Sequence, residues 1–297
     1  MELTPFIRAV ALLPCGLVIA GCSSLPGLYT AAKDAVVEEF NACKVADAGR
    51  FVITGAALET DTASGEVSVA NASGRIAPEG TLTRIFLGLT ALDATVGADG
   101  FTTAQGVSGA PVAGVTSTVA GLNAYGLTFP SGDARSAASL VLGVPSAGTA
   151  LPTTGQALFS GPIALDFALS GADTVTATGL ITVTASYASQ QISAQVTDLK
   201  MSSGTAPFAE LEWIGLAPCN TRVGSAGRGT VQAKAESGRV ITLVGASTAS
   251  PTGTAILDGA FYGLQNETAA PRAVGGVLLM SGDQGTVSGI FLADLKK

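Results

Sequence analysis

The residues best able to carry chemistry lie near the start of the chain, where Ala20 and Gly21 precede Cys22. The apolar run that leads to them, residues 9–20, is too short to cross a bilayer as a helix and is typical of the centre of a signal peptide. A lipoprotein signal peptidase accepts only small residues beside the bond that it cuts, and the cysteine that follows carries diacylglycerol on its thiol. We therefore expect a signal peptide over residues 1–21 and lipidation of Cys22. The alternative is an ordinary signal peptide with a chance cysteine.

Acyl chains on Cys22 would tether the mature chain to a membrane without spanning it. Stable anchoring needs more than one chain, because each buried methylene contributes only about 0.8 kcal/mol, and diacylglycerol with an added palmitate meets that need. Ser23 follows the cysteine where an aspartate would favour retention in the inner membrane of some bacteria, so we expect the outer membrane. Residues 22–47 are predicted to form a tether and one amphipathic helix, because apolar residues recur at spacings of four and three from Leu28 to Cys43.

The remaining cysteines predict a disulfide. Of the 4 cysteines, Cys15 leaves with the signal peptide and Cys22 is acylated, so Cys43 and Cys219 are the thiols left in an oxidising compartment. Pairing them would tie the N-terminal segment to the C-terminal half of the chain. Two separately buried free thiols are the alternative, because the sequence does not show the distance between them.

Composition excludes several classes of function. The chain has no histidine, which removes Ser-His-Asp and Cys-His catalysis and the commonest zinc ligand. The net charge of −7 argues against nucleic acid as a partner. Two carboxylate pairs could in principle serve a glycosidase, but as surface charges they need no such role: Asp166 with Asp173, and Glu210 with Glu212. We expect no enzyme, no cofactor and no metal site.

Beyond residue 47 the pattern predicts an all-β chain. Glycine, alanine, serine, threonine and valine dominate, and turn signals recur between short apolar segments. Residues 179–187 and 190–201 alternate with a period of two and are expected to form a hairpin. The segments 84–96 and 136–144 fit either a helix or buried strands. A turn-rich run at residues 145–155 places a boundary near Ala150 and divides the chain into lobes at 48–150 and 151–297.

Three groups of residues in the second lobe resemble transferrin-binding protein B-like lipoproteins. The stretch Leu151 to Gly161 resembles the entry to that family's barrel, and Gly179 to Leu199 is similar to its middle strand pair. The end of the chain looks like that family's closing series of glycines and aromatic residues: Gly259-Ala-Phe261-Tyr262-Gly263, then Gly275-Gly276-Val277, then Gly289-Ile-Phe291. The resemblance covers about half of the chain. One departure is that the family usually has a glutamate shortly before the Gly-Gly pair, whereas residues 270–274 here contain none, so we carry no binding residue over.

The resemblance implies an all-β fold in which the N-terminal amphipathic helix precedes a β-rich handle domain at 48–150 and an eight-stranded antiparallel β-barrel at 151–297. It also implies a lipoprotein that is delivered to the cell surface and binds a ligand. Members with two handle–barrel lobes bind transferrin, whereas this chain has room for one, so transferrin itself is not the expected partner. The identity of the ligand and the ligand-binding residues stay unknown.

Three functions remain open at this stage. The first is a surface-displayed binding module for a protein or a small solute, and the second is a structural envelope lipoprotein with no dedicated ligand. The third is a lipocalin-like carrier, which needs an open barrel interior. We expect aromatic side chains to fill that interior instead: Phe159, Phe167, Phe261, Tyr262 and Phe291. Among possible contact residues, Trp213 beside Cys219 is more typical of core packing, and Tyr125 is the better loop candidate.

Overall fold

The computed structural model describes residues 53–76, 82–97, 99–144, 146, 152–169, 173–189, 191–203, 210–216, 218–219, 222–223, 231–234, 240–241, 254–263, 271–282 and 285–297. Side chains are described for these except at 54, 169, 210–255 and 281–282. The described residues belong to one compact unit of the chain, Phe40–Lys297. The signal peptide, the tether and the predicted helix at residues 28–43 lie outside them.

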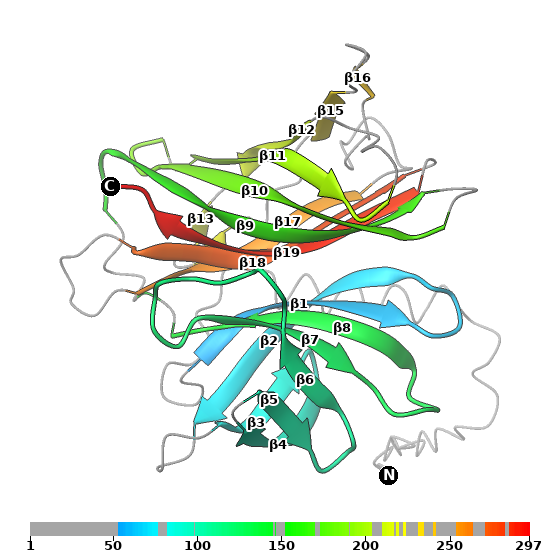
Figure 1. The fold of residues 1–297 in the computed structure, drawn as a ribbon. Coiled ribbons are helices and arrows are strands. Elements are labelled where there is room, and N and C mark those ends of the chain that lie inside the picture. Colours follow the sequence, from blue (N-terminus) through cyan, green and yellow to red (C-terminus); the bar gives the residue numbers. More distant parts are fainter. Residues whose placement is uncertain are drawn as a thin grey trace, which may run out of the picture. The chain divides into compact units, whose positions relative to one another are not determined.

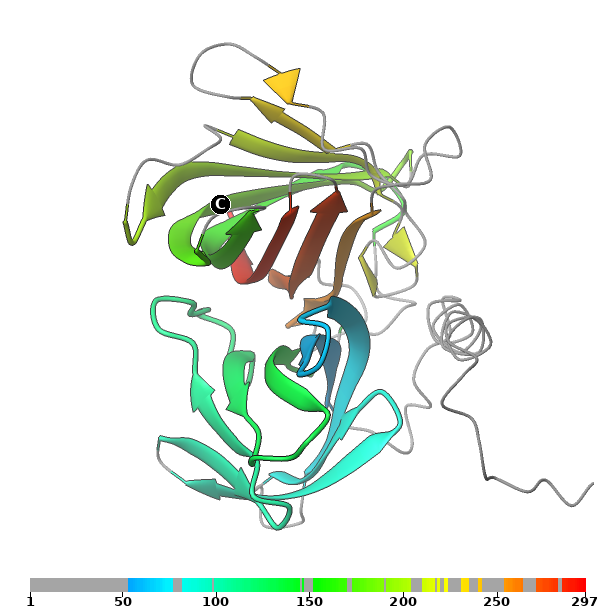
Figure 2. The same cartoon turned by 90° about the vertical axis from the view of Figure 1, so that its right-hand side faces the viewer.

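All regular structure in the described part of the chain is β-strand (Figure 1), which confirms the predicted all-β class. The first eight strands form a closed antiparallel barrel in which each strand pairs with the next and β1 pairs with β8. Figure 2 shows these strands curving round into a ring. Their bounds are β1 Ile53–Asp61, β2 Val67–Ile76, β3 Leu82–Leu87, β4 Thr90–Gly97, β5 Gly100–Thr103, β6 Ser108–Pro111, β7 Asn123–Thr128 and β8 Arg135–Leu142.

Alternation along the strands fills this barrel. On β3 the side chains of Ile85 and Leu87 are buried, whereas that of Arg84, which directly precedes Ile85, is exposed. Leu92 of β4, Phe101 of β5 and Leu140 of β8 belong to the same internal cluster. Space inside is tight, because a Cβ added at Gly109 would lie 2.3 Å from the Phe101 ring. The inside of the barrel is therefore a packed apolar core.

The later strands form a second antiparallel sheet of 11 strands in the order β13-β14-β17-β18-β19-β9-β10-β11-β12-β15-β16. β9 pairs with β19, so the start of this region lies beside the end of the chain. The bounds are β9 Gln156–Leu169, β10 Val175–Ser186, β11 Gln191–Met201, β12 Glu210–Leu216, β13 Pro218–Cys219, β14 Arg222–Val223, β15 Val231–Lys234, β16 Val240–Ile241, β17 Thr254–Tyr262, β18 Ala273–Gly282 and β19 Gly285–Leu295.

Strands β17 to β19 are buried on both faces. One face belongs to the sheet's own core, which contains Phe159, Phe167, Phe261 and Phe291 as predicted. The other face carries Tyr262, Val277 and Leu292, and it packs in one cluster with barrel residues such as Ala56 and Val141. Tyr262 thus faces away from the core to which the sequence assigned it, because neighbouring residues of a strand point to opposite faces.

The closed barrel differs in position from the prediction. Eight strands close into a barrel before the predicted boundary at residue 150, where a β-rich handle was expected, and the residues after it form the 11-stranded sheet. The two segments that fit either a helix or buried strands form strands: 84–96 contains parts of β3 and β4, and 136–144 contains most of β8. Periodicity does not distinguish helix from strand here because β3, β4 and β8 are only 6 to 8 residues long.

Candidate functional site

Four turns of the barrel emerge at one end, which we call the turn end. Because consecutive strands run antiparallel, the turns after β1, β3, β5 and β7 all leave the barrel on the same side. Two contacts support this grouping: the Thr62 amide donates to the Ala134 carbonyl at 3.0 Å, and a Cβ at Gly106 would lie 3.7 Å from Pro130. The turn end therefore gathers residues 62–66, 88–89, 104–107 and 129–134.

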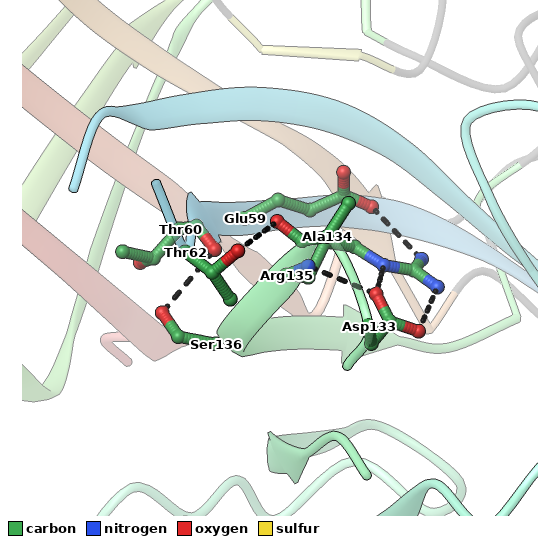
Figure 3. Close-up of polar contacts among 7 residues, drawn as sticks. All are labelled: Glu59, Thr60, Thr62, Asp133, Ala134, Arg135 and Ser136. Atoms are coloured by element: carbon green, nitrogen blue, oxygen red, sulfur yellow. Dashed lines mark hydrogen bonds and ion pairs between the residues drawn. The ribbon is translucent and has the colours of Figure 1, made fainter. Parts of the chain in front are cut away.

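At the turn end, a charged cluster joins the first and last strands of the barrel (Figure 3). We call Glu59, Asp133 and Arg135 the seam cluster. The Arg135 Nε donates to Asp133 Oδ1 at 3.1 Å, and its Nη1 lies 3.8 Å from Glu59 Oε1. The guanidinium carbon also lies 4.3 Å from the centre of the Phe129 ring, a cation–π contact. The Arg135 charge is therefore satisfied within the protein, where it helps to close the barrel.

The seam cluster also sets the electrostatics of this end. The hydrogen bond from Arg135 lowers the pKa of Asp133 below its ordinary value, and this effect outweighs the opposing effect of burial. Hydroxyl groups add to the seam, since Ser136 Oγ donates to the Thr60 carbonyl and Thr62 Oγ1 to the Ala134 carbonyl, each at 3.3 Å. The sequence does not reveal this cluster, because its members come from strands that meet only when the barrel closes.

The β1–β2 turn is built on one carboxylate oxygen. Oδ1 of Asp61 accepts from the Ala63 amide at 2.9 Å, from the Ser64 amide at 2.8 Å and from the Ser64 hydroxyl at 2.9 Å. Such side-chain to backbone bonds stabilise tight turns. The neighbouring β3–β4 turn presents Leu89, whose side chain is 77% exposed. The turn end thus offers ordered backbone with one apolar tip.

The outer wall of the barrel carries a row of charges across β2, β3 and β4. Arg75 pairs directly with Arg84, and Arg84 pairs with Asp93. Both nitrogens Nε and Nη2 of Arg84 lie 2.5 Å from Asp93 Oδ1, and the two side chains are about half exposed. Arg75 is exposed and makes no ion pair among the described residues. We call Arg75, Arg84 and Asp93 the arginine row.

The opposite end of the barrel meets the second sheet through a loop between β6 and β7. Asp294 of β19 accepts from the Ser117 hydroxyl at 2.5 Å and from the Thr118 amide at 2.7 Å. Val115, Val119 and Leu122 of the same loop are buried in the cluster shared with the second sheet. This loop is thereby held in place, and its contact with Asp294 is structural.

No family model matches the chain, and no curated protein matches it. Solved structures do. A single-residue variant of the vaccine antigen transferrin binding protein B from Haemophilus parasuis Hp5 matches with a TM-score of 0.50 at 12% identity, over 83% of this chain and 45% of that one. The chain has a transferrin-binding-protein-B-like fold. It spans a little under half the length of that relative.

Two further structures match this chain with lower TM-scores. Isotype 1 transferrin binding protein B from serogroup B Neisseria meningitidis gives a TM-score of 0.46 at 14% identity, over 83% of this chain and 44% of that one. A protein described as a surface lipoprotein gives 0.36 at 10% identity, over 82% of this chain and 98% of that one. Likeness at these identities concerns the fold and does not extend to individual residues.

The structure describes some of the residues predicted from the sequence, and others lie outside the described residues. Cys22 and Cys43 lie outside the described residues. Cys219 belongs to β13 and pairs with Arg222 along the backbone, but its side chain is not described, and the same holds for Trp213 in β12. The proposed disulfide and the role of the tryptophan are therefore untested by the structure.

The prediction that Tyr125 is a loop residue is wrong. The residue lies in β7, half-buried, and its ring meets Phe101 edge to face with centres 5.2 Å apart. Burial raises the pKa of its hydroxyl. Tyr125 shares a face of β7 with Leu127, which belongs to the core inside the barrel, whereas Ala124 lies on the opposite face. Tyr125 thus packs into the barrel interior.

Of the four carboxylates considered for chemistry, the two whose side chains the structure describes, Asp166 and Asp173, are exposed. Asp166 lies on β9, and partial desolvation of its carboxyl group raises its pKa. Asp173 lies just before β10. Glu210 and Glu212 begin β12, and their side chains are not described. Within the described residues, no group of three metal-ligating side chains comes together, and no helix is long and apolar enough to span a membrane.

Proposed function

We propose that this chain is an outer-membrane-anchored lipoprotein, displayed on the cell surface, that acts as a binding module for a protein or a small solute. The observation that carries the proposal is Ala20-Gly21-Cys22 at the head of a chain with a transferrin-binding-protein-B-like fold. The sequence supplies the anchor, and the similar antigen, whose name states that it binds transferrin, supplies the precedent for a binding role. The resemblance is one of fold, so the partner of this chain is a separate question.

The packing of the barrel favours a binding site on the surface over one inside. Apolar side chains from seven of the eight barrel strands meet in a single cluster, which includes Ile53, Ala72, Leu92, Phe101 and Leu127. A lipocalin-like carrier needs an open interior, and the observed packing gives that alternative no support. The exposed turn end and the outer wall of the barrel are therefore candidate surfaces for a partner.

Three carboxylates of the first lobe are engaged by neighbouring groups and do not favour a catalytic role. Asp61 builds a turn, Asp93 pairs with Arg84, and Asp133 pairs with Arg135. Each is committed to a neighbour as a charged acceptor, whereas a general acid needs a raised pKa in a cleft. The chain has no histidine to serve instead.

We also propose that Cys43 and Cys219 form a disulfide in the mature protein. Closing the long loop from Cys43 to Cys219 would stabilise the fold by roughly 5 kcal/mol in the chain-entropy treatment of cross-links, before any strain in the native state is subtracted. Mass spectrometry of unreduced proteolytic fragments would detect the linked peptides. Recovery of both cysteines as alkylated free thiols from freshly secreted protein would rule the pairing out.

Protease accessibility on intact cells tests the proposed function. Cells producing the full chain are treated with an external protease, with a periplasmic protein as the internal control, and the lipoprotein is followed by immunoblot. Degradation of the lipoprotein while the control survives supports surface display. Survival until the outer membrane is opened would contradict display and make a structural envelope role the leading account.

A matched variant tests the anchor in the same cells. Cys22→Ala removes the acylated thiol and changes no residue of the described structure. We expect this variant to lose incorporation of labelled palmitate and to leave the membrane fraction. A Cys15→Ala variant, altered inside the predicted signal peptide, should keep both properties. Full membrane retention of Cys22→Ala would overturn lipid anchoring at this residue.

A further inference from the structure

The arginine row breaks a rule that most of this barrel obeys. Arg75 and Arg84 face each other directly across the β2–β3 pair, where Cβ atoms are about 4.5–5.5 Å apart and like charges are destabilising. The chain as a whole is acidic, with a net charge of −7, so an excess of basic residues does not explain why two arginines face each other. Places where a protein breaks a local rule without internal compensation are typical of functional surfaces.

Only half of the row's positive charge is compensated within the described part of the molecule. Asp93 on β4 pairs with Arg84, because the Nε and Nη2 atoms of Arg84 both lie 2.5 Å from Oδ1 of Asp93. Arg75, on the other side of Arg84, is exposed and makes no ion pair among the described residues. A carboxylate placed between the two arginines would turn the row into alternating signs, since Asp93 already supplies the negative charge at the far end.

The position of the row leaves it open to a partner. Ile85 of β3 and Leu92 of β4 point into the barrel core, so Arg84 and Asp93, one position away on each strand, point outward. The Thr83 hydroxyl donates to the Arg75 carbonyl at 3.0 Å and holds the two strand ends together. The half-buried Phe86 lies on the same face of β3 as Arg84, and arginine with an aromatic neighbour is the composition of an interaction hot spot.

We propose that the outer wall of β2, β3 and β4 is a docking surface for an acidic polypeptide segment, one carboxylate of which bridges Arg75 and Arg84. A guanidinium offers planar paired donors to a carboxylate, and Asp93 shows that one arginine of this row already binds that group. This inference rests on the proposed binding function and assigns it a surface and a class of partner.

The test uses the full mature lipoprotein in a non-ionic detergent and a fluorescent peptide of ten residues that alternates glutamate and threonine. Binding is followed by fluorescence anisotropy at low ionic strength, where exposed charges are least screened. A peptide with glutamine at every glutamate position is the control ligand. We expect the glutamate peptide to bind, the glutamine peptide not to bind, and added salt to weaken the interaction.

Four variants separate this surface from general electrostatics. Arg75→Gln and Arg84→Gln should each weaken binding of the glutamate peptide by roughly threefold to fivefold, the upper part of the range for exposed ion pairs. Asp93→Asn should strengthen it, because Arg84 loses its internal competitor. Arg272→Gln removes the same charge from an exposed position in the second lobe and should leave binding unchanged.

The outcomes decide the proposal. Equal weakening by Arg75→Gln and Arg272→Gln, or weaker binding by Asp93→Asn, would overturn it. Inorganic phosphate that binds more tightly than the peptide and loses affinity in Arg75→Gln would also overturn it, because the partner class would then be phosphorylated. Unfolding midpoints check folding, and Arg75→Gln should not lower its midpoint, since it relieves repulsion. If the glutamate peptide does not bind, the docking surface is overturned and surface display is unaffected. If the lipoprotein resists external protease, surface display is overturned and the peptide result is unaffected. The two proposals therefore fail separately.

Discussion

The two lobes solve the problem of joining strands in different ways. The barrel of β1 to β8 closes at a seam where Glu59, Asp133 and Arg135 meet beside the backbone pairs of β1 and β8. Strands β17 to β19 of the second sheet have apolar residues on both faces, and their buried carboxylate, Asp258, is only 1% exposed. The first lobe uses polar contacts to fix one joint, whereas β17 to β19 of the second are held by packing on both faces. Removing a charge of the seam cluster should therefore loosen the closure of the barrel, whereas removing a buried side chain should weaken β17 to β19.

Close backbone approach is common to both lobes and depends on glycine. A Cβ at Gly55 would lie 1.7 Å from the Val141 carbonyl oxygen across the barrel seam. In the second sheet, a Cβ at Gly161 would lie 2.1 Å from the Leu292 oxygen, where β9 meets β19. At both joints the chain needs a residue without a side chain so that distant strands can pair.

The largest effect is expected from Phe261→Ala in the core of the second sheet. The Phe261 side chain is fully buried, with ring centres of Phe159 and Tyr187 at 5.8 and 6.4 Å. Its removal should lower the free energy of unfolding by about 3–5 kcal/mol, from lost burial and the cavity that remains. Urea unfolding measures this, with Leu89→Ala as an exposed control of little effect. A loss below 1 kcal/mol would mean that this core is not closely packed.

Gly55→Ala should have the next largest effect, at the barrel seam. The new methyl group would overlap the Val141 carbonyl, which belongs to backbone and cannot rotate away. We expect a loss of about 3 kcal/mol, the upper part of the range for overpacking. Gly97→Ala is the matched control, because its Cβ would lie no closer than 3.8 Å to a neighbour. Equal stability of the two variants in urea would show that the seam tolerates separation of β1 from β8.

The long strands of the second sheet could be predicted from the sequence. Residues 179–187 and 190–201 alternate clearly, and they form most of β10 and β11 with the expected antiparallel pairing. Phe159, Phe167, Phe261 and Phe291 meet in one core because each falls on the same face of its strand. Period-two patterns and buried aromatic residues are local properties, so one sequence reveals them.

The closure of the first lobe could not be predicted in the same way. Whether eight short strands close depends on the pairing of β1 with β8, residues such as Leu58 and Ser139 that are far apart in the chain. Arg135 and Glu59 become neighbours only through that pairing, and nothing in their local sequence marks either as a partner. Tyr125 was misplaced for a related reason: glycine and asparagine around it are typical of a loop, but tertiary pairing makes the segment a strand.

Asp294→Ala tests the link between the lobes and should have a moderate effect. The variant leaves the Ser117 hydroxyl and the Thr118 amide without their charged acceptor. Hydrogen bonds to charged groups contribute about 1.5–3 kcal/mol, and the partly exposed site favours the lower end of that range. Unfolding in urea measures the loss, and hydrogen exchange of residues 112–122 should speed up while exchange in β10 does not change. Faster exchange in both regions would indicate general destabilisation instead of a local link.

The smallest effect concerns pH and the seam cluster. Because the folded pKa of Asp133 is lowered, its ion pair with Arg135 contributes stability that is complete above the ordinary aspartate value near 4 and is lost as pH falls through the lowered value. Arg135→Gln should therefore cost about 1 kcal/mol at pH 6, and the difference from the parent should shrink toward pH 2.5. Urea midpoints at the two pH values measure this difference. Ser131→Ala, a neutral change in the same exposed turn, should show a difference that does not depend on pH. A difference for Arg135→Gln that stays constant between the two pH values would assign the arginine's contribution to Phe129 and packing, and the first lobe would then resemble the second in how its strands are joined.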